Sequence, residues 1–372
     1  MPRSRSLRAD AGQLLVCGFE GPALQTSTRE MLRHVQPAGV MLFARNIESP
    51  AQTHALLHDC RAEVSAPLFR CVDMEGGTVD RFKRVLAPSP SAAAVFATGK
   101  RKNFRRHGQL IGEACRALGF NVDFAPALDL ALVPSRAVLG SRVVSPDPKK
   151  VTAYATEFLR GLSSAGVLGC GKHFPGLGEA ALDTHFQLPS VFKSWNELWK
   201  HDLVPYRRLY RALPFILVAH ALYPEVASDG PASLSPHWIT TVLRQKIGYR
   251  GLIATDDMEM QGVLAAAPIE EAAVRAIAAG ADLLLICRQE DLIVRAYEAM
   301  VRAAENDSNF SNLVEHSARR VLAFKRTHGR LTKIPPSPKP AAINRLREQL
   351  QDFTATIESA NARQSANEQM TK

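Results

Sequence analysis

The sequence predicts an α/β protein, a closed (β/α)8 barrel of the TIM type. About eight short apolar runs recur along the 372 residues, and stretches with helical spacing separate them. The runs are continuous rather than alternating, as expected for strands that are buried on both faces. Strand–helix alternation favours a parallel sheet with crossover helices, and eight units favour a closed barrel. An open dinucleotide-binding sheet would carry G-x-G-x-x-G after its first strand, where this chain has GFEGPA.

The elements follow one another at regular intervals. The predicted strands cover residues 14–21, 39–46, 67–77, 121–130, 166–176, 215–223, 251–260 and 281–288. Helices are predicted over 28–35, 51–64, 152–165 and 269–281, where apolar residues recur three to four positions apart. We therefore expect a basic extension at 1–11 and the barrel at 12–330. Residues 331–372 are predicted to form a Pro-rich linker and a helical, then disordered, tail without chemistry.

Composition narrows the class of protein. The chain is 46% apolar and 22% charged, which is ordinary for a globular protein with a large core. No apolar run approaches the roughly 18 residues that a membrane helix needs. The first run, LLVCGF, is too short for a secretory signal. The six cysteines form no C-x-x-C pair and mostly lie in apolar runs, which predicts buried, reduced thiols and a cytoplasmic protein.

The net charge of +10 does not by itself indicate nucleic-acid binding. The densest basic cluster, Gly99–His107, contains a single aromatic residue, Phe104, so a solvated face is the simpler interpretation. A functional interpretation of the cluster is that it steers an anionic substrate toward the protein. We expect no nucleic-acid or membrane partner, and a monomer or weak oligomer.

Polar side chains follow the apolar part of five predicted strands: Asp73 and Glu75, Asp129, Lys172 and His173, His220, and Asp256 and Asp257. In a barrel these positions are the C-terminal strand ends, where active sites are built. Any one of them has a simpler explanation, such as a helix cap or a core histidine. Together on one rim they predict a site. The segment GKHFPGLGEAALDTH, residues 171–185, is then a strand end followed by a catalytic loop that Gly and Pro shape.

Four segments resemble motifs of family 3 glycoside hydrolases, in the β-N-acetylglucosaminidase branch. KHFPGLGEAALDTH is similar to K-H-F-P-G-H-G…D-S-H, and GLIATDDMEMQGV to the nucleophile segment S/T-D-D-x-x-M-x-G. VDMEGGTVDRF is similar to D-Q-E-G-G-R-V-x-R-F, and GFNVDFAPALDL to G-I-N-x-x-F-A-P-V-L-D. The four occur in the family's order, and the resemblance covers about residues 12–330, which makes it far more specific than a lone motif.

The resemblance implies a role for each matching residue. Asp256 would be the nucleophile, His185 the general acid and base, and Asp183 the partner of His185. The sugar hydroxyls and the N-acetyl group would be bound by Asp73, Arg81, Arg142, Lys172 and His173. Glu75 is expected to support the loop at Gly76 and Gly77, Asp257 to cap a helix or contact a hydroxyl, and His220 to line the pocket. No cofactor and no metal is implied.

The implied chemistry is consistent with the residue types. A retaining glycosidase usually needs two carboxyl groups, a nucleophile and an acid/base. Here a His–Asp dyad would take the second role, because imidazole titrates near pH 6.5 and can donate to the leaving oxygen and then accept a proton from water. A carboxylate such as Asp183 would favour the imidazolium and orient the ring.

The chain also departs from the family's pattern. Leu177 and Thr78 stand where the family has histidine and arginine, and Met74 and Glu179 replace glutamine and aspartate. Three alternatives therefore stay open. One is a family 3 enzyme for another β-sugar, or one that transfers to phosphate. Another is a metal-dependent barrel hydrolase with ligands among His173, Asp183, His185, His220 and Asp256. The third is a degenerate barrel that binds sugar without turnover.

Overall fold

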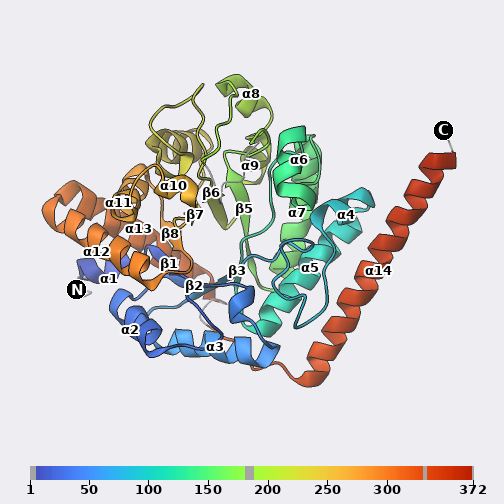
Figure 1. Cartoon of the computed structure of the whole chain (residues 1–372), viewed down its shortest axis with the longest axis horizontal. Helices are drawn as coiled ribbons and strands as arrows, with labels where there is room; N and C mark the ends of the chain where they lie inside the picture. The colour runs from blue at the N-terminus through green and yellow to red at the C-terminus, as the bar shows by residue number, and fades with distance from the viewer. Residues whose placement is uncertain (1–5, 181–187, 330–332, 371–372) are drawn as a thin grey trace.

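The computed structural model is a closed barrel of eight parallel strands with helices around it (Figure 1). It describes residues 6–180, 188–329 and 333–370. The strands run in sequence order around the barrel, and β8 pairs with β1 through Leu285 and Val16. The predicted (β/α)8 fold and its C-terminal helix are thereby confirmed.

Each strand lies inside one of the predicted runs. The strands are β1 (Leu15–Cys17), β2 (Gly39–Leu42), β3 (Phe69–Val72), β4 (Val122–Asp123), β5 (Leu168–Phe174), β6 (Phe215–Val218), β7 (Leu252–Asp257) and β8 (Leu283–Ile286). They are shorter than the runs because the C-terminal part of most runs has already left the sheet to form a loop.

The helices account for the segments with helical spacing. They are α1 (Leu7–Gly12), α2 (Thr26–Val35), α3 (Pro50–Ala62), α4 (Ala92–Ala97), α5 (Arg101–Leu118), α6 (Val133–Leu139), α7 (Pro148–Ser164), α8 (Trp195–Lys200), α9 (Val204–Leu209), α10 (Gln261–Leu264), α11 (Ile269–Ala279), α12 (Glu290–Asn306), α13 (Ser308–Thr327) and α14 (Pro340–Met370). Short turns of 3₁₀ helix are η1 (Ala44–Asn46), η2 (Gly140–Arg142) and η3 (Ala232–Leu234), and η4 (His237–Lys246) is a π-helix.

Local sequence sets several of these bounds. At α3 the Ser49 hydroxyl accepts from Gln52 N, the Gln52 side chain accepts from Ser49 N, and Pro50 occupies the first turn. These are the start signals of a capping box and an N-terminal proline. Helix α5 ends at Gly119, whose φ of 100° only glycine adopts readily.

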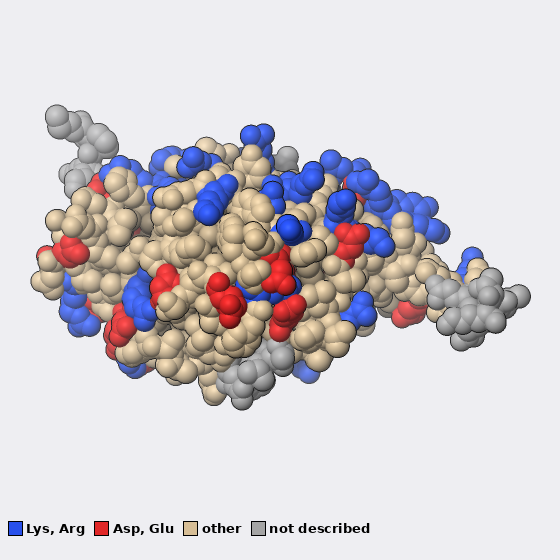
Figure 2. Space-filling view, turned by 90° about the horizontal axis from the view of Figure 1, so that it is seen from above, with Lys and Arg blue, Asp and Glu red and all other residues tan. Residues whose placement is uncertain are grey.

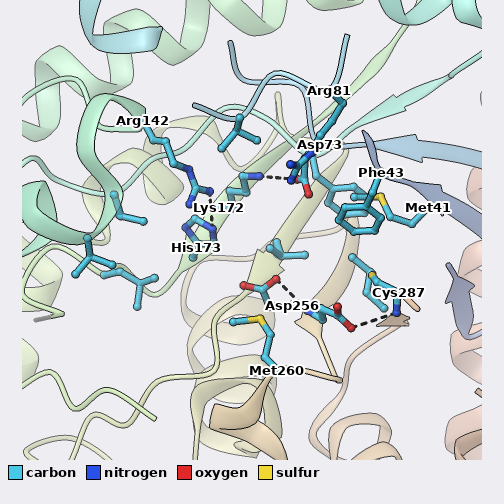
Figure 3. A pocket seen from close by; sticks show the side chains of 18 of the residues that line it. Met41, Phe43, Asp73, Arg81, Arg142, Lys172, His173, Asp256, Met260 and Cys287 are labelled. Atoms are coloured by element: carbon cyan, nitrogen blue, oxygen red, sulfur yellow. Dashed lines mark hydrogen bonds and ion pairs between the residues drawn. The ribbon is translucent and has the colours of Figure 1, made fainter. Parts of the chain in front are cut away.

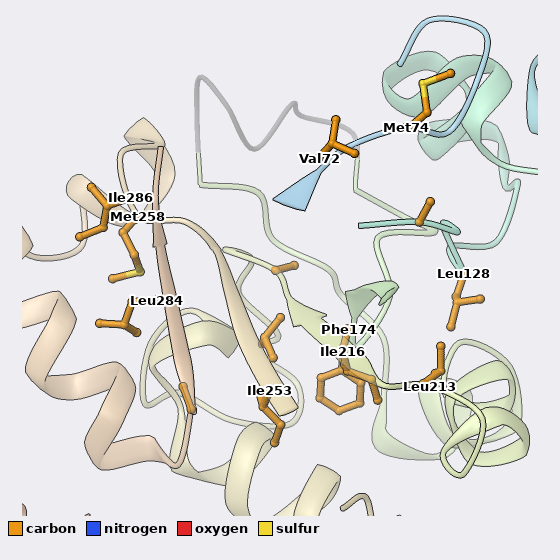
Figure 4. Close-up of a cluster of buried hydrophobic side chains, with 14 of the residues drawn as sticks. Val72, Met74, Leu128, Phe174, Leu213, Ile216, Ile253, Met258, Leu284 and Ile286 are labelled. Carbon is orange, nitrogen blue, oxygen red and sulfur yellow. The ribbon is translucent and has the colours of Figure 1, made fainter. Parts of the chain in front are cut away.

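Two apolar layers hold the barrel together. Along β8, Leu283 and Leu285 join the cluster inside the barrel, whereas Leu284 and Ile286 join the cluster between strands and helices. Alternate residues of a strand point to opposite faces, so a strand such as β8 contributes to both layers. Figure 4 shows part of the outer layer, with Phe174 beside Ile216 of β6 and with Leu284 and Ile286 of β8 at the other side of the group. This explains why the runs are apolar without interruption.

Both ends of the described chain are packed against the barrel. Leu7 begins α1 inside the predicted basic extension, and Asp10 and Ala11 are buried against neighbouring helices. At the other end, α14 continues to Met370, beyond the helix that the sequence suggested, and lies along α4 and α5 (Figure 1). The domain boundaries at 11 and 330 stay a prediction.

Two expectations from composition can be compared with the structure. All six cysteines are buried and none is in a disulfide, as predicted. None of the described helices has both the length and the apolar character needed to cross a bilayer. The basic side chains are unevenly spread: on the face in Figure 2, Lys and Arg occupy much of one margin, and Asp and Glu lie nearer the centre.

Candidate active site

A pocket opens at the C-terminal ends of the barrel strands. Its cavity volume is about 150 Å³, and the cavity is open to solvent on one side. Six of the eight predicted site residues line it: Asp73, Arg81, Arg142, Lys172, His173 and Asp256 (Figure 3). The other two, Asp183 and His185, lie outside the described residues.

Lys172 is the centre of a buried ion-pair network on one side of the pocket. Its Nζ lies 2.7 Å from Asp73 Oδ1 and 2.7 Å from Glu75 Oε1. Arg142 then binds both oxygens of Glu75, through Nε at 3.0 Å and NH2 at 2.9 Å. The side chains of Lys172 and Glu75 are almost fully buried, whereas Asp73 remains partly open to the pocket. Two cations from β5 and η2 and two carboxylates from the loop after β3 therefore fix one another.

The network also determines the protonation of its members. Burial alone would raise the pKa of Glu75, but Arg142 and Lys172 outweigh it and hold that pKa well below its usual range. Burial would likewise lower the pKa of Lys172, and Asp73 and Glu75 reverse this and raise it. Both groups are thus charged at every ordinary pH, and Glu75 forms ion pairs with both Arg142 and Lys172. Its predicted support of the loop at Gly76 and Gly77 stays a prediction.

His173 is held in one tautomer. Its Nδ1 lies 2.7 Å from Asp129 Oδ2, and its Nε2 lies 3.2 Å from Arg142 NH2. Since a guanidinium only donates, Nε2 accepts and Nδ1 carries the proton that is donated to Asp129. Asp129 also accepts from the backbone N of His173 and of Leu177. Asp129 thus anchors the C-terminal end of β5 and the start of the loop that follows it. Its position after β4 in the sequence did not predict this role.

Asp256 lies across the pocket from this network, at the end of β7 (Figure 3). Its Oδ1 accepts from Asp257 N at 2.9 Å. Asp257 turns toward the chain instead: its Oδ1 accepts from Glu259 N at 3.1 Å and from Cys287 N at 3.2 Å. Burial raises the pKa of Asp257 to about 7, with a smaller contribution from the charges of Glu259 and Asp256. Of the adjacent pair, Asp256 is the carboxylate better placed to react with a ligand.

The remaining walls are apolar. Met41, Leu217 and Leu285 belong to the layer inside the barrel and also line the pocket, so its floor is the top of that core. The guanidinium of Arg81 lies over the ring of Phe43, 5.4 Å from the ring centre. Sequence reasoning did not find Met41, Phe43, Leu217 and Leu285, because inside a strand run they look like ordinary core positions.

His220 does not line the pocket, so that prediction is wrong. Its side chain is buried and contacts the Ser233 hydroxyl at 2.6 Å and the Asp257 carbonyl at 3.0 Å. It follows β6 as expected, but it points into the packing behind β7. Its contact is with the backbone of the loop that follows Asp256, so it supports that loop from behind.

The departures from the family's pattern fall in different surroundings. Leu177 is buried and lines the pocket, and Met74 is buried in the outer core layer. Thr78 is exposed. Glu179 lies 3.6 Å from Lys193. Among the described residues, no group of three or more His, Cys, Asp or Glu side chains is arranged to hold a metal.

A parallel barrel with a carboxylate facing a charged network across a pocket at its C-terminal rim is compatible with a barrel glycosidase. The chain matches the glycosyl hydrolase family 3 N terminal domain over residues 6–324. It therefore belongs to glycoside hydrolase family 3, and the predicted enzyme class is confirmed.

Several similar proteins are named as β-hexosaminidases or β-N-acetylglucosaminidases. A beta-hexosaminidase of Bordetella avium is 36% identical over 287 residues, covering 73% of this chain and 79% of its own length. One of Pseudomonas aeruginosa is 35% identical over 289 residues, covering 77% and 86%. Among solved structures, a family 3 β-N-acetylglucosaminidase from Paenibacillus gives a TM-score of 0.87 at 30% identity, over 94% of this chain and 69% of that one. NagZ from Neisseria gonorrhoeae, in complex with N-trifluoroacetyl-D-glucosamine, gives 0.71 at 28%, over 83% and 98%.

Proposed function

We propose that the protein is a retaining exo-β-N-acetylglucosaminidase, which removes terminal non-reducing β-GlcNAc. The observation that carries this proposal is the position of Asp256 at the end of β7, across one pocket from Lys172 and Asp73. A carboxylate on one side and hydrogen-bonding charges on the other are what a sugar ring held for attack at its anomeric carbon requires.

In the proposed reaction Asp256 attacks the anomeric carbon and forms a covalent glycosyl-enzyme. The bond to the leaving oxygen breaks as His185 donates a proton to that oxygen. His185 then takes a proton from water, whose oxygen replaces Asp256 on the sugar. Asp183 orients the imidazole. The roles of His185 and Asp183 rest on the resemblance of the segment that contains them.

The binding roles follow from the fixed network. Asp73 can accept from sugar hydroxyls, while Lys172, Arg142 and Arg81 can donate to hydroxyl and carbonyl oxygens. His173 presents its Nε2 edge beside Arg142. Because these groups are already positioned by one another, little reorganisation is needed when a sugar binds. Phe43 and the apolar floor offer a surface for the less polar parts of the ring and its N-acetyl group.

The substrate class is the finer part of the proposal. Cell-wall fragments, such as GlcNAc on anhydromuropeptides, and chito-oligosaccharides both end in β-GlcNAc. The carboxylates of cell-wall fragments are complementary to the net charge of +10. NagZ of Neisseria gonorrhoeae was solved with a GlcNAc analogue, which supports the same sugar here. Six buried thiols suit a reducing, cytoplasmic compartment and a role in peptidoglycan recycling.

The test is an assay of aryl β-glycosides, with and without phosphate, on the full chain. We expect hydrolysis of aryl β-GlcNAc, with the β anomer as the first product. Asp256→Ala should abolish it, and Asp291→Ala, an exposed carboxylate on α12, should not. Full activity of the Asp256 variant would contradict the nucleophile, and turnover that depends on phosphate would favour a phosphorylase.

A further inference from the structure

We propose that the C-terminal helix α14 is a positioning element of the active site, which acts through the loop after β3. This inference rests on the proposed function, because the loop carries the sugar-binding residues Asp73 and Arg81. Helix α14 lies beyond residues 6–324 that match the family, and the sequence predicted a tail without chemistry. The structure instead connects it to the pocket by a short series of contacts.

The loop after β3 folds back on itself in two strips. The inner strip, residues 73–81, faces the pocket, and the outer strip, residues 82–91, lies behind it. Gly77 N donates to Ser89 O at 2.9 Å. The buried carboxylate of Asp80 accepts from Phe82 N at 2.9 Å and from Ser89 N at 2.8 Å. One backbone hydrogen bond and the Asp80 carboxylate therefore join the two strips, so we expect them to move together.

The two strips are in such close contact at Gly76 and Gly77 that no side chain would fit there. A Cβ on Gly76 would come within 2.2 Å of Pro90 O, and one on Gly77 within 2.5 Å of Ser91 Cβ. Both glycines have positive φ, at 83° and 61°. A displacement of Pro90 or Ser91 is thus passed directly to the backbone beside Glu75, which holds Arg142 and Lys172 in the pocket.

Helix α14 donates to backbone carbonyls of the outer strip and of α4. Arg347 donates to Leu86 O at 3.1 Å and to Val85 O at 3.4 Å. The Thr354 hydroxyl lies 3.0 Å from Pro88 O and 2.9 Å from Leu350 O of its own helix, so its one proton is shared between the two carbonyls. About two helical turns further on, Asn361 donates to Ala94 O at 2.9 Å. The donors are spaced along one face of the helix and contact the outer strip at residues 85, 86 and 88 and α4 at residue 94.

Apolar contacts reach the inner strip as well. Leu350 and Ile357 of α14 are fully buried, and the ring of Phe353 stacks on His107 with 6.1 Å between centres. His107 Nε2 would lie 3.1 Å from a Cβ on Gly76, so this ring separates α14 from the inner strip. Burial lowers the pKa of His107 to about 3, so the ring is neutral and contributes by packing.

The helix is also tied down where it begins. In the linker before it, Lys333 O accepts from Arg70 NH2 at 3.4 Å, and Pro335 O contacts His54 Nε2 at 2.7 Å. Arg70 lies at the start of β3, at the opposite end of the barrel from the pocket. The linker and α14 together therefore connect the bottom of β3 to the loop at its top.

The consequence is specific to sugar binding. Asp256 is on β7, whereas the described part of α14 packs mainly against α5 and α4. Loosening α14 should weaken the grip on the sugar through Asp73, Glu75 and Arg81, while the nucleophile keeps its place. We expect a higher KM and weaker inhibition by GlcNAc, with kcat nearly unchanged.

The experiment compares two double variants of the full chain. Arg347→Met with Thr354→Val removes the donors to the outer strip and keeps side-chain volume. Arg345→Met with Thr356→Val changes the same residue types on exposed positions of α14, where the Thr356 hydroxyl bonds only to its own helix at Asp352 O. The first should raise KM for aryl β-GlcNAc and Ki for GlcNAc about 5-fold at 25 °C, the equivalent of one hydrogen bond. The second should change neither.

Hydrogen exchange of the ligand-free protein gives a readout that does not depend on activity. The Gly77 amide, which donates to Ser89 O, should exchange faster in the first variant than in the second. A lower melting temperature with KM and Gly77 exchange unchanged would show a purely structural helix and overturn the proposal. If the wild type does not cleave aryl β-GlcNAc, the proposed function fails, while exchange at Gly77 still decides the role of α14. Should the double variant fold poorly, Thr354→Val alone gives the same comparison.

Discussion

The two sides of the pocket are built on different principles. On the binding side, from the loop after β3, from β5 and from η2, side chains hold one another: Lys172 binds Asp73 and Glu75, and Arg142 binds Glu75. On the β7 side, the backbone holds carboxylates, and Asp256 and Asp257 accept from main-chain N–H groups. The apolar floor lies between them.

The two kinds of support correspond to two tasks, sugar binding and nucleophilic attack. A network of buried ion pairs is costly to desolvate and strongly destabilised when one member is removed, so it gives a rigid, specific surface rather than stability as such. A carboxylate held by backbone donors keeps its side chain available for bond formation. Binding thus depends on many coupled groups, and attack depends on one.

The largest effect is expected on the β7 side. Asp256→Ala removes the nucleophile and should lower kcat by roughly 10⁴-fold, because loss of a nucleophile removes the covalent route. KM should stay within about 3-fold, since the binding side is intact. Steady-state kinetics with aryl β-GlcNAc measure both. A variant whose KM rises while kcat holds would mean that Asp256 binds sugar and does not attack it.

The next largest effect tests the coupling on the binding side. Glu75→Gln leaves Lys172 and Arg142 without their shared counter-charge, and we expect the free energy of unfolding to fall by about 3 kcal/mol. The value of kcat/KM should fall roughly 100-fold, because Arg142 and Lys172 lose their fixed positions. Urea unfolding and kinetics provide the two values. A loss below about 1 kcal/mol would show that the pairs are independent of one another.

A variant of Arg81 tests how far the binding side extends beyond the ion-pair network. Among the described residues its Nε has no hydrogen-bond partner, and its guanidinium rests on Phe43. Arg81→Met should therefore raise KM about 10-fold, the value of one charged hydrogen bond to the sugar, with little change in stability. Arg84→Met, an exposed position in the same loop, is the control. Equal KM values for both variants would remove Arg81 from the site.

The smallest effect concerns Asp257 and pH. Its pKa is about 7 in the folded chain, against about 3.9 for an ordinary Asp. Between pH 4 and 7 the unfolded chain has released the proton that the folded chain keeps, so the stability from this group falls as pH rises and levels off above pH 7. Partial exposure to pocket water limits the change to about 1 kcal/mol. Urea unfolding of wild type and Asp257→Asn at pH 4.5 and 8 should reveal this difference. A wild-type curve parallel to that of the variant would contradict the raised pKa.

Much of the fold could be predicted from the sequence because the signals are local. Each strand of a parallel barrel is buried on both faces, so it reads as an uninterrupted apolar run, and β8 with LLLI is an example. The charged residues that follow the runs then had to meet at one rim. Lys172, Asp73 and Asp256 do so, although they are far apart in the chain.

What could not be predicted depends on side-chain direction and on distant packing. Asp129 and His220 both follow strands, yet one anchors the loop after β5 and the other packs behind β7. Position after a strand does not distinguish these directions. Likewise, nothing within residues 340–370 shows that α14 would meet the loop after β3, because that contact depends on how the linker crosses the barrel.

The most direct test of the account is mass spectrometry of the enzyme after reaction with a slowly released GlcNAc derivative that carries fluorine on the ring and a good leaving group. We predict one covalently bound sugar per chain, on the peptide that contains Asp256, and none on the Asp256→Ala variant. A sugar bound to a different carboxylate, or turnover without any bound sugar, would contradict the claim that Asp256 attacks from β7 while the binding side holds the ring.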